Sequence, residues 1–336
     1  GLGQVSIVSS LLFGGVVGSA IAVVSGIGGA MIPQMVKRGF DRDFAVNVTI
    51  TAALVALLVP PSHNLILYSA SAGGGISIAD LFAAGIVPAL LMTLTLMLTG
   101  WAIARRRGYA TESFPGGRAV LVRLVAALPG LLLVALIFVG IKAGIFTAIE
   151  SASIAVVYAL LVTTLVYRGL DRHAFLETLG GAARTTGVIL FVIAAATSFG
   201  WLLAYLQVPA AAVEALRAIA DNKYAILILL NLVLLVLGTF MDLAPLIIIC
   251  TPIFLPVARA FGIDPLHFGV ILILNGGIGL ITPPVGSVLF VGSAIGQISI
   301  TQALRSIWPF YLAAFAVLVL VTYIPALTLW LPALLK

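Results

Sequence analysis

The sequence predicts an all-α protein that crosses a membrane several times. Of the 336 residues, 62% are hydrophobic and only 8% are charged, and the mean hydropathy is +1.26. In a soluble domain roughly a quarter of the residues are charged, so this chain has too few charged residues to cover the surface of a water-soluble fold. Apolar runs close to the roughly 20 residues that a helix needs to cross hydrocarbon recur along the chain, at 81–104, 124–141, 149–167, 186–206 and 310–331. The alternation typical of β-strands is absent, which argues against a barrel.

The basic residues indicate how the chain is oriented. The net charge is +6, and the lysines and arginines lie in short connections between apolar runs, where the positive-inside rule applies. In the orientation that we favour, 12 of the 17 face the cytoplasm: Lys37, Arg38, Arg42, Arg105, Arg106, Arg107, Arg118, Arg123, Arg168, Arg172, Arg184 and Arg305. This bias requires that segments 5–37 and 224–262 each enter and leave on one side. Both carry Gly or Pro near the middle, so each is predicted to be a re-entrant hairpin.

A repeat is visible when the chain is shifted by 223 residues against itself. The shift aligns Gly15 with Gly238 and Pro33 with Pro256, and it aligns the Pro60-Pro61 pair with Pro283-Pro284. Each repeat consists of a hairpin, a Gly-x-Asp turn and a long apolar segment that a Pro-Pro pair interrupts. The charge bias makes the first hairpin open inward and the second outward, so the repeats are inverted, as in many transporters.

Four segments follow from this pattern. We expect a first repeat at 1–78, connecting scaffold helices at 79–206, a second repeat at 207–297 and a C-terminal transmembrane helix at 298–336. The chain begins with Gly1 rather than Met, inside an apolar segment without a basic leader, so we interpret it as truncated or processed rather than as carrying a signal peptide.

The interrupted helices predict cation sites. A Pro pair removes two N–H donors, and the carbonyls that it frees are costly in lipid unless a partner such as a cation satisfies them. Half-helix ends add dipoles, because N-termini attract anions and C-termini attract cations. The predicted cation ligands lie at the hairpin tips and helix breaks: Gly18, Ser19, Val59, Pro60, Pro61, Ser62, Thr239, Asp242, Gly279, Thr282, Pro283 and Gly286. Na⁺ is the only metal ion that we expect.

Several residues leave alternatives open. Asp242 either contributes to an ion site or caps the second helix of its hairpin, and the two roles are compatible. His63 either gates or senses protons or has no transport role. Asn275 either faces a site or bonds a neighbouring helix. Glu150 is interpreted as a helix-start carboxylate, and His173 and His267 are expected at the membrane interface. The substrate is predicted to lie at midplane, contacted by Ser19, Ala20, Asn275, Pro284 and Ser287.

Enzyme classes find little support in the sequence. The chain contains neither a P-loop nor an HExxH motif, which argues against ATP hydrolysis and metalloprotease activity. An intramembrane hydrolase would need a base beside its nucleophile, and Ser19 has no evident His or Lys partner at its depth. The single cysteine, Cys250, is expected to be a buried structural thiol. The sequence therefore predicts a transporter, not an enzyme.

The motifs resemble those of the large membrane subunit of TRAP transporters, the DctM-like family, over essentially the whole chain. The matching stretches are Leu12-Phe13-Gly14-Gly15, Gly18-Ser19-Ala20, Met31-Ile32-Pro33, Lys37-Arg38-Gly39-Phe40-Asp41, Val59-Pro60-Pro61-Ser62, Gly144-Ile145-Phe146-Thr147-Ala148-Ile149-Glu150, His267-Phe268-Gly269-Val270 and Gly279-Leu280-Ile281-Thr282-Pro283-Pro284-Val285-Gly286. Two departures concern the first repeat, where 52–56 lacks the usual hydroxyls and Val23 replaces a common acidic residue. The first cation site is therefore expected to rely on backbone carbonyls or to be weaker.

The resemblance implies a function and an assembly. It implies sodium-coupled import (symport) of a small organic anion of the carboxylate class across the bacterial inner membrane, by an elevator-type movement. It also implies two partners, a periplasmic substrate-binding protein and a small four-helix membrane subunit, with sodium as coupling ion and no organic cofactor. The alternative is a stand-alone ion or anion transporter of related inverted-repeat fold that works without a binding protein.

Overall fold

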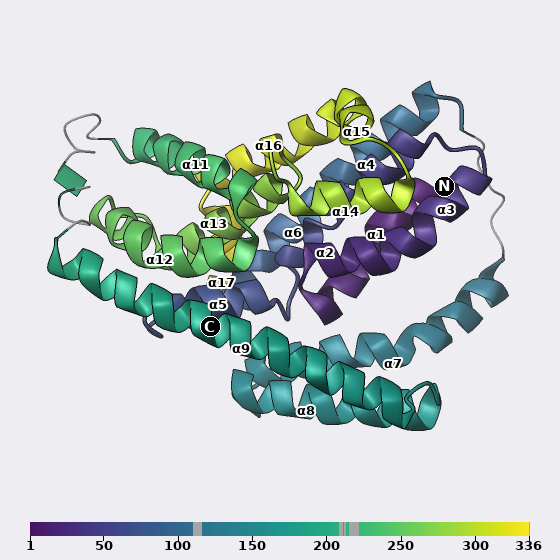
Figure 1. Cartoon of the computed structure of the whole chain (residues 1–336), viewed down its shortest axis with the longest axis horizontal. Coiled ribbons are helices and arrows are strands. Elements are labelled where there is room, and N and C mark those ends of the chain that lie inside the picture. The colour runs from purple at the N-terminus through teal and green to yellow at the C-terminus, as the bar shows by residue number, and fades with distance from the viewer. Residues whose placement is uncertain (110–115, 208–210, 212, 215–221, 336) are drawn as a thin grey trace. The chain divides into compact units, whose positions relative to one another are not determined.

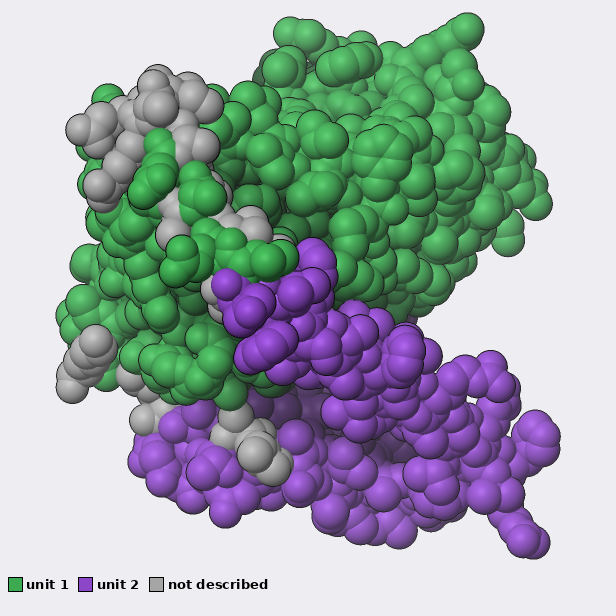
Figure 2. Space-filling view, turned by 60° about the vertical axis from the view of Figure 1, so that its left-hand side comes forward, with its two compact units in different colours: residues 1–113, 206–336 green, residues 114–205 purple. Residues whose placement is uncertain are grey.

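The computed structural model describes residues 1–109, 116–207, 211, 213–214 and 222–335. These residues form helices joined by turns, and the described part of the chain contains no strand (Figure 1). The chain divides into two compact units, one made of Gly1–Ser113 with Leu206–Lys336 and the other of Phe114–Tyr205 (Figure 2). Six described helices are long and apolar enough to cross a membrane, or up to eight if each of two bent helix pairs forms one span. The predicted all-α polytopic class is confirmed.

The first predicted hairpin is a pair of helical arms that meet at Gly18-Ser19. Its first arm is α1 (Leu2–Val17), and its second is the continuous run of α2 (Ala20–Val23), the π-helical η1 (Val24–Gly28) and α3 (Gly29–Lys37). Gly18 ends α1 in the left-handed conformation, with φ of 63°, which glycine adopts without steric cost. Ser19 then caps the second arm, because its Oγ accepts a hydrogen bond of 3.4 Å from the Ala22 N–H.

The second predicted hairpin has the same organisation. Its arms are α11 (Lys223–Phe240) and α12 (Leu243–Ala260), which lie side by side in Figure 1. Met241 and Asp242 between them have extended backbone conformations, so the chain leaves one helix and starts the next within two residues.

Both long apolar segments are broken at their Pro pairs, as predicted. The first is α4 (Arg42–Ala52), the 3₁₀ turn η2 (Val55–Leu57) and α5 (His63–Ser71), and the second is α13 (Pro265–Leu280) and α14 (Ser287–Gly296). Hydroxyl groups satisfy carbonyls freed at each break. The Ser62 hydroxyl donates to the Leu57 carbonyl at 2.6 Å, and the Tyr311 hydroxyl donates to the Ile281 carbonyl at 2.5 Å.

Each repeat has a close backbone contact between its hairpin and its broken segment. A Cβ atom added to Gly14 of α1 would lie 2.5 Å from Cα of Ala56, and one added to Gly279 of α13 would lie 2.5 Å from the carbonyl carbon of Gly238 in α11. Ala56 and Gly279 occupy equivalent positions, 223 residues apart. The second half of each broken segment packs against the other repeat: α5 packs against α12, and α14 packs against α4 and η1. The core of this unit therefore interlocks both repeats.

The remaining helices of this unit are α6 (Ile78–Arg106), α15 (Ile300–Ser306), α16 (Trp308–Tyr323) and α17 (Ala326–Leu334). Segment 298–336, predicted to be one transmembrane helix, thus contains three helices, and α16 and α17 are bent by 61°. Pro325 lies at this bend and cannot donate a backbone hydrogen bond. Helix α6, which the sequence placed with the scaffold, packs against α1, α16 and α17 within the unit that contains both repeats.

The second unit contains α7 (Gly117–Lys142), α8 (Ala148–Leu161), the π-helical η3 (Val162–Val166) and α9 (Arg172–Tyr205). Helix α8 starts with a capping box, in which Thr147 accepts a hydrogen bond from the Glu150 N–H and Glu150 accepts one of 2.8 Å from the Thr147 N–H. This confirms Glu150 as a helix-start carboxylate. With 34 residues, α9 begins earlier than the crossing predicted at 186–206.

Candidate functional site

A small pocket lies where the two hairpin tips meet the break of the first repeat. Its volume is about 40 Å³, which is space for about three water molecules. The residues that line it come from the starts of α2, α5 and α12 and from the helices beside them: Ser19, Ala20, Ile21, Leu57, His63, Asn64, Asp242, Leu243, Ala244 and Leu280. All of them belong to one compact unit, and both repeats contribute.

The first hairpin tip is tied directly to the helix break of its own repeat. The Asn64 side chain is 1% exposed, and its Nδ2 donates a hydrogen bond of 2.9 Å to the Gly18 carbonyl. A Cβ atom added to Gly18 would lie 3.0 Å from Nδ1 of His63, so a larger residue would displace the imidazole. Glycine at position 18 therefore serves both the left-handed turn and the close approach of α5.

Removing the Asn64 amide is expected to destabilise the protein by about 1–3 kcal/mol, because the buried Gly18 carbonyl would lose its partner. Asn64→Ala should lower the thermal unfolding temperature of the detergent-purified protein. Gln302→Ala, which removes an exposed amide from α15, is the matched control and should leave that temperature unchanged. Equal unfolding temperatures for Asn64→Ala and the control would show that this hydrogen bond does not hold the hairpin tip.

His63 and Asp242 bring polar side chains from both repeats to the pocket. Both side chains are exposed, and the Asp242 carboxylate and the Val17 carbonyl are the electrostatic neighbours of the His63 ring. His63, 44 residues further along the chain, lines the same pocket as Ser19, a proximity that the sequence did not show. Ser19 Oγ accepts the Ala22 N–H, and no hydrogen bond between Ser19 and His63 occurs in the described structure.

Asp242 occupies the N-cap position of α12 without capping through its side chain. Its backbone carbonyl accepts the Leu246 N–H at 3.1 Å, but its carboxylate accepts no hydrogen bond from the first turn of the helix. Asp264 at the start of α13 shows the contrast, since its Oδ1 accepts the Leu266 N–H at 2.8 Å. The Asp242 carboxylate is therefore available to a ligand in the pocket.

Hydroxyl and carbonyl oxygens also gather at the second break. The Thr239 carbonyl accepts hydrogen bonds from the N–H groups of Val285 and Gly286, at 3.2 and 3.4 Å. The hydroxyls of Thr239 and Thr282 donate to carbonyls of their own helices, so their lone pairs stay free for a cation. The structure thus brings Thr239, Thr282 and Gly286 near one another, while the pocket around Asp242 includes Leu280 but not Thr282.

The structure places only some of the predicted substrate contacts at this pocket. Ser19 and Ala20 line the pocket, whereas Asn275, Pro284 and Ser287 do not. The Asn275 amide donates to the side-chain oxygen of Asn231 at 2.7 Å and lines a separate apolar pocket of about 170 Å³. Ser287 Oγ is buried and has no partner among the described residues. Of the predicted break residues, Val59, Pro60, Pro61 and Pro283 lie in the gaps between helices and outside the pocket lining.

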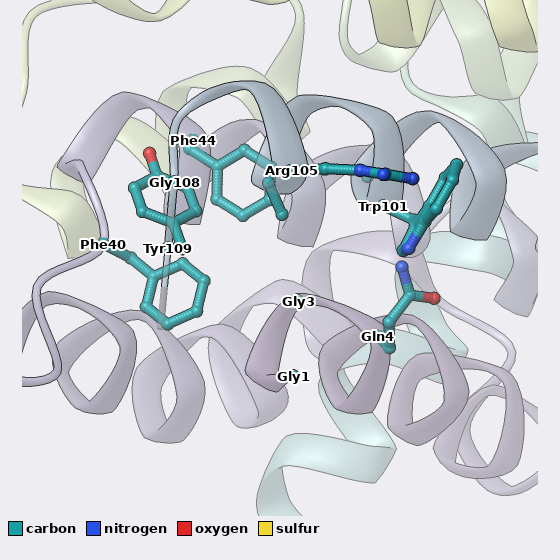
Figure 3. Close-up of a pocket in the computed structure, with 11 residues that line it drawn as sticks. Gly1, Gly3, Gln4, Phe40, Phe44, Trp101, Arg105, Gly108 and Tyr109 are labelled. Carbon is teal, nitrogen blue, oxygen red and sulfur yellow. The ribbon is translucent and has the colours of Figure 1, made fainter. Parts of the chain in front are cut away.

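A larger pocket lies elsewhere, between the start of α1 and the end of α6 (Figure 3). It measures about 400 Å³, and none of the predicted site residues lines it. The rings of Phe40 and Tyr109 pack with centroids 4.5 Å apart, and the Arg105 guanidinium lies 5.5 Å above the Trp101 ring. Burial raises the pKa of Tyr109, as does the hydrogen bond that its hydroxyl donates to Asp41 at 2.6 Å. These contacts form an aromatic surface rather than an ion site.

Comparison with known proteins assigns the chain to a family. The family model for the tripartite ATP-independent periplasmic transporter, DctM component, matches residues 1–327. The chain is 39% identical over 333 residues to the sialic acid TRAP transporter large permease protein SiaM of Vibrio cholerae, covering 99% of this chain and 78% of that protein. It is 35% identical over 347 residues to the C4-dicarboxylate TRAP transporter large permease protein DctM of Rhodobacter capsulatus, covering 100% and 79%. It is 33% identical over 327 residues to the 2,3-diketo-L-gulonate TRAP transporter large permease protein YiaN of Escherichia coli, covering 97% and 76%. The chain belongs to the DctM component family of tripartite ATP-independent periplasmic transporters.

Proposed function

We propose that the chain imports a small carboxylate anion together with sodium, as the large membrane subunit of a tripartite transporter. The observation that carries the proposal is the pocket shared by both repeats, with the free carboxylate of Asp242 beside the tip of the first hairpin. The general function, that of a membrane transporter, follows from the family, because its members are multi-pass permeases of the inner membrane and not enzymes.

The oxygen atoms at the breaks support sodium as the coupling ion. Hard cations bind carboxylates, hydroxyls and backbone carbonyls. Asp242 and Ser19 supply such oxygens at the pocket, and Thr239 and Thr282 supply them at the second break. The described residues contain no cluster of three or more His, Cys, Asp or Glu of the kind that holds a transition metal.

The helix starts at the pocket support an anionic substrate. Helices α5 and α12 and the second arm of the first hairpin begin there, and helix N-termini attract carboxylates. The relatives named above are permeases for sialic acid, C4-dicarboxylates and 2,3-diketo-L-gulonate. Since ligand pockets usually measure about 300–1,000 Å³, the hairpin tips have to separate before such a molecule can enter. An elevator movement of the unit that contains both repeats is part of this proposal.

The proposed partners are a periplasmic substrate-binding protein, which delivers the anion, and a small four-helix membrane subunit. The word tripartite in the family description supports both. Uptake by the chain and the small subunit without any binding protein would instead favour the stand-alone transporter.

Replacing sodium by choline at constant pH is expected to reduce uptake to background. The assay uses proteoliposomes that contain the chain and its small subunit, supplied with the binding protein and with radiolabelled sialic acid, malate or gluconate. Replacing chloride by a larger anion at constant sodium is the control and should leave the rate unchanged. Uptake that persists in choline would contradict sodium coupling.

A further inference from the structure

We infer that His63 is a specificity-determining residue whose Nε2 accepts a hydrogen bond from a hydroxyl group of the transported anion. The inference rests on the proposed function and narrows its substrate class to hydroxylated organic acids. Three observations support it. His63 is exposed although its two neighbours are buried and hydrogen-bonded, the Nδ1 edge of its ring faces Gly18, and the pocket has a particular set of lining residues.

The first observation is local. Ser62 and Asn64 on either side of His63 are buried, and each donates a hydrogen bond to a backbone carbonyl. His63 between them is exposed and lines the pocket. The neighbours therefore fix the start of α5, while the imidazole remains free to meet a ligand. A histidine that served only to build the helix break would be buried and bonded as its neighbours are.

The second observation concerns the two ring nitrogens. The Val17 carbonyl is an electrostatic neighbour of the ring, and Nδ1 is the edge that faces the next residue, Gly18. A carbonyl can only accept, so we assign the proton of the neutral ring to Nδ1. A neutral imidazole carries one N–H, and Nε2 is then left as an acceptor. The close approach to Gly18 also restricts the orientation of the ring.

The third observation is what the pocket offers to a ligand. None of the ten lining residues is a lysine or an arginine, and the Asp242 carboxylate can only accept hydrogen bonds. With Nε2 of His63 as a second acceptor, the pocket presents two acceptors beside the helix N-termini that suit a carboxylate. A ligand that satisfies both features carries hydroxyl donors next to its carboxylate. An acid without hydroxyls would fill the pocket and leave Nε2 without this partner.

The test compares acids that differ only in their hydroxyl groups, in proteoliposomes with the small subunit and the binding protein. The pairs are malate against succinate and gluconate against hexanoate, with sialic acid as a further hydroxylated probe. Wild type is expected to transport at least one hydroxylated acid about tenfold faster than its unsubstituted partner, as expected for the loss of one hydrogen bond. Transport of the unsubstituted partner at an equal rate would overturn the inference while leaving sodium-coupled transport intact.

The variants separate recognition from folding. His63→Phe keeps a ring but removes the acceptor, and it should reduce the preference for the hydroxylated acid to about twofold or less with an unchanged sodium dependence. His63→Gln, whose amide reaches the position of Nε2, should restore part of the preference. His173→Phe is the matched control at a histidine whose side chain is 91% exposed. A retained preference in His63→Phe, or a shift in its sodium dependence alone, would overturn the inference.

Discussion

Replacing Asp242 with asparagine is expected to leave the protein folded and inserted but to suppress sodium-driven uptake. The carboxylate lines the pocket and accepts no hydrogen bond from α12, so its charge is not used for capping. Two unit charges 4 Å apart attract by about 4 kcal/mol at the effective dielectric constant of a protein surface, and losing a third of this weakens cation binding about tenfold. The sodium concentration for half-maximal uptake should therefore rise by about tenfold or more.

Asp264→Asn is the matched control for this variant. Asp264 also occupies an N-cap position, but there the side chain accepts the Leu266 N–H. Asparagine caps helices nearly as well as aspartate, so the control should retain both its unfolding temperature and its sodium curve. A wild-type sodium curve for Asp242→Asn would show that the carboxylate is structural and that the cation binds elsewhere.

The breaks of the fold could be predicted because their causes are local. A Pro pair cannot continue a helix wherever it occurs, so Pro60-Pro61 and Pro283-Pro284 identify the gaps without any knowledge of tertiary structure. Gly18 likewise marks the first hairpin tip, because a left-handed residue ends a helix. Repetition of these signals after 223 residues then predicted the second repeat.

The composition of the pocket could not be predicted, because it depends on which helices pack together. The sequence predicts both Asp242 and Thr282, which belong to the same repeat, as cation ligands, and this remains a prediction. In the structure the pocket joins Asp242 with Ser19 and His63 of the first repeat, since α5 packs against α12. Apolar residues on nearly every helix face leave no periodic signal that specifies these neighbours.

His267 is a single residue whose contacts likewise could not be predicted from the sequence. Its expected place at the membrane interface stays a prediction, and the structure shows in addition that its side chain is buried, with 2% exposed. Its Nδ1 lies 2.8 Å from the Thr328 hydroxyl and its Nε2 lies 3.2 Å from the Thr322 carbonyl, on either side of the bend between α16 and α17. The bend at Pro325 frees backbone groups, and a buried histidine satisfies one of them. Sequence alone does not show which polar residue will meet such a bend.

Replacing Gly279 with alanine is expected to destabilise the protein by about 1–3 kcal/mol, the usual cost of overpacking. The added Cβ would lie 2.5 Å from the carbonyl carbon of Gly238, and both sides of this contact are backbone, so no side chain can move aside. The helices α11 and α13 would have to separate, and the second hairpin would shift relative to its helix break. Thermal unfolding in detergent should show the loss, together with reduced uptake.

The sign of the effect distinguishes this contact from ordinary helix propensity. Alanine in place of glycine at an exposed helix position normally stabilises by up to about 1 kcal/mol. Gly29 in the second arm of the first hairpin is exposed and has no atom within 4 Å of an added Cβ, so Gly29→Ala should raise the unfolding temperature or leave it unchanged. Opposite shifts for Gly279→Ala and Gly29→Ala would show that close backbone packing holds the hairpin against the broken helix. Equal stabilisation of both variants would contradict the close contact between α11 and α13.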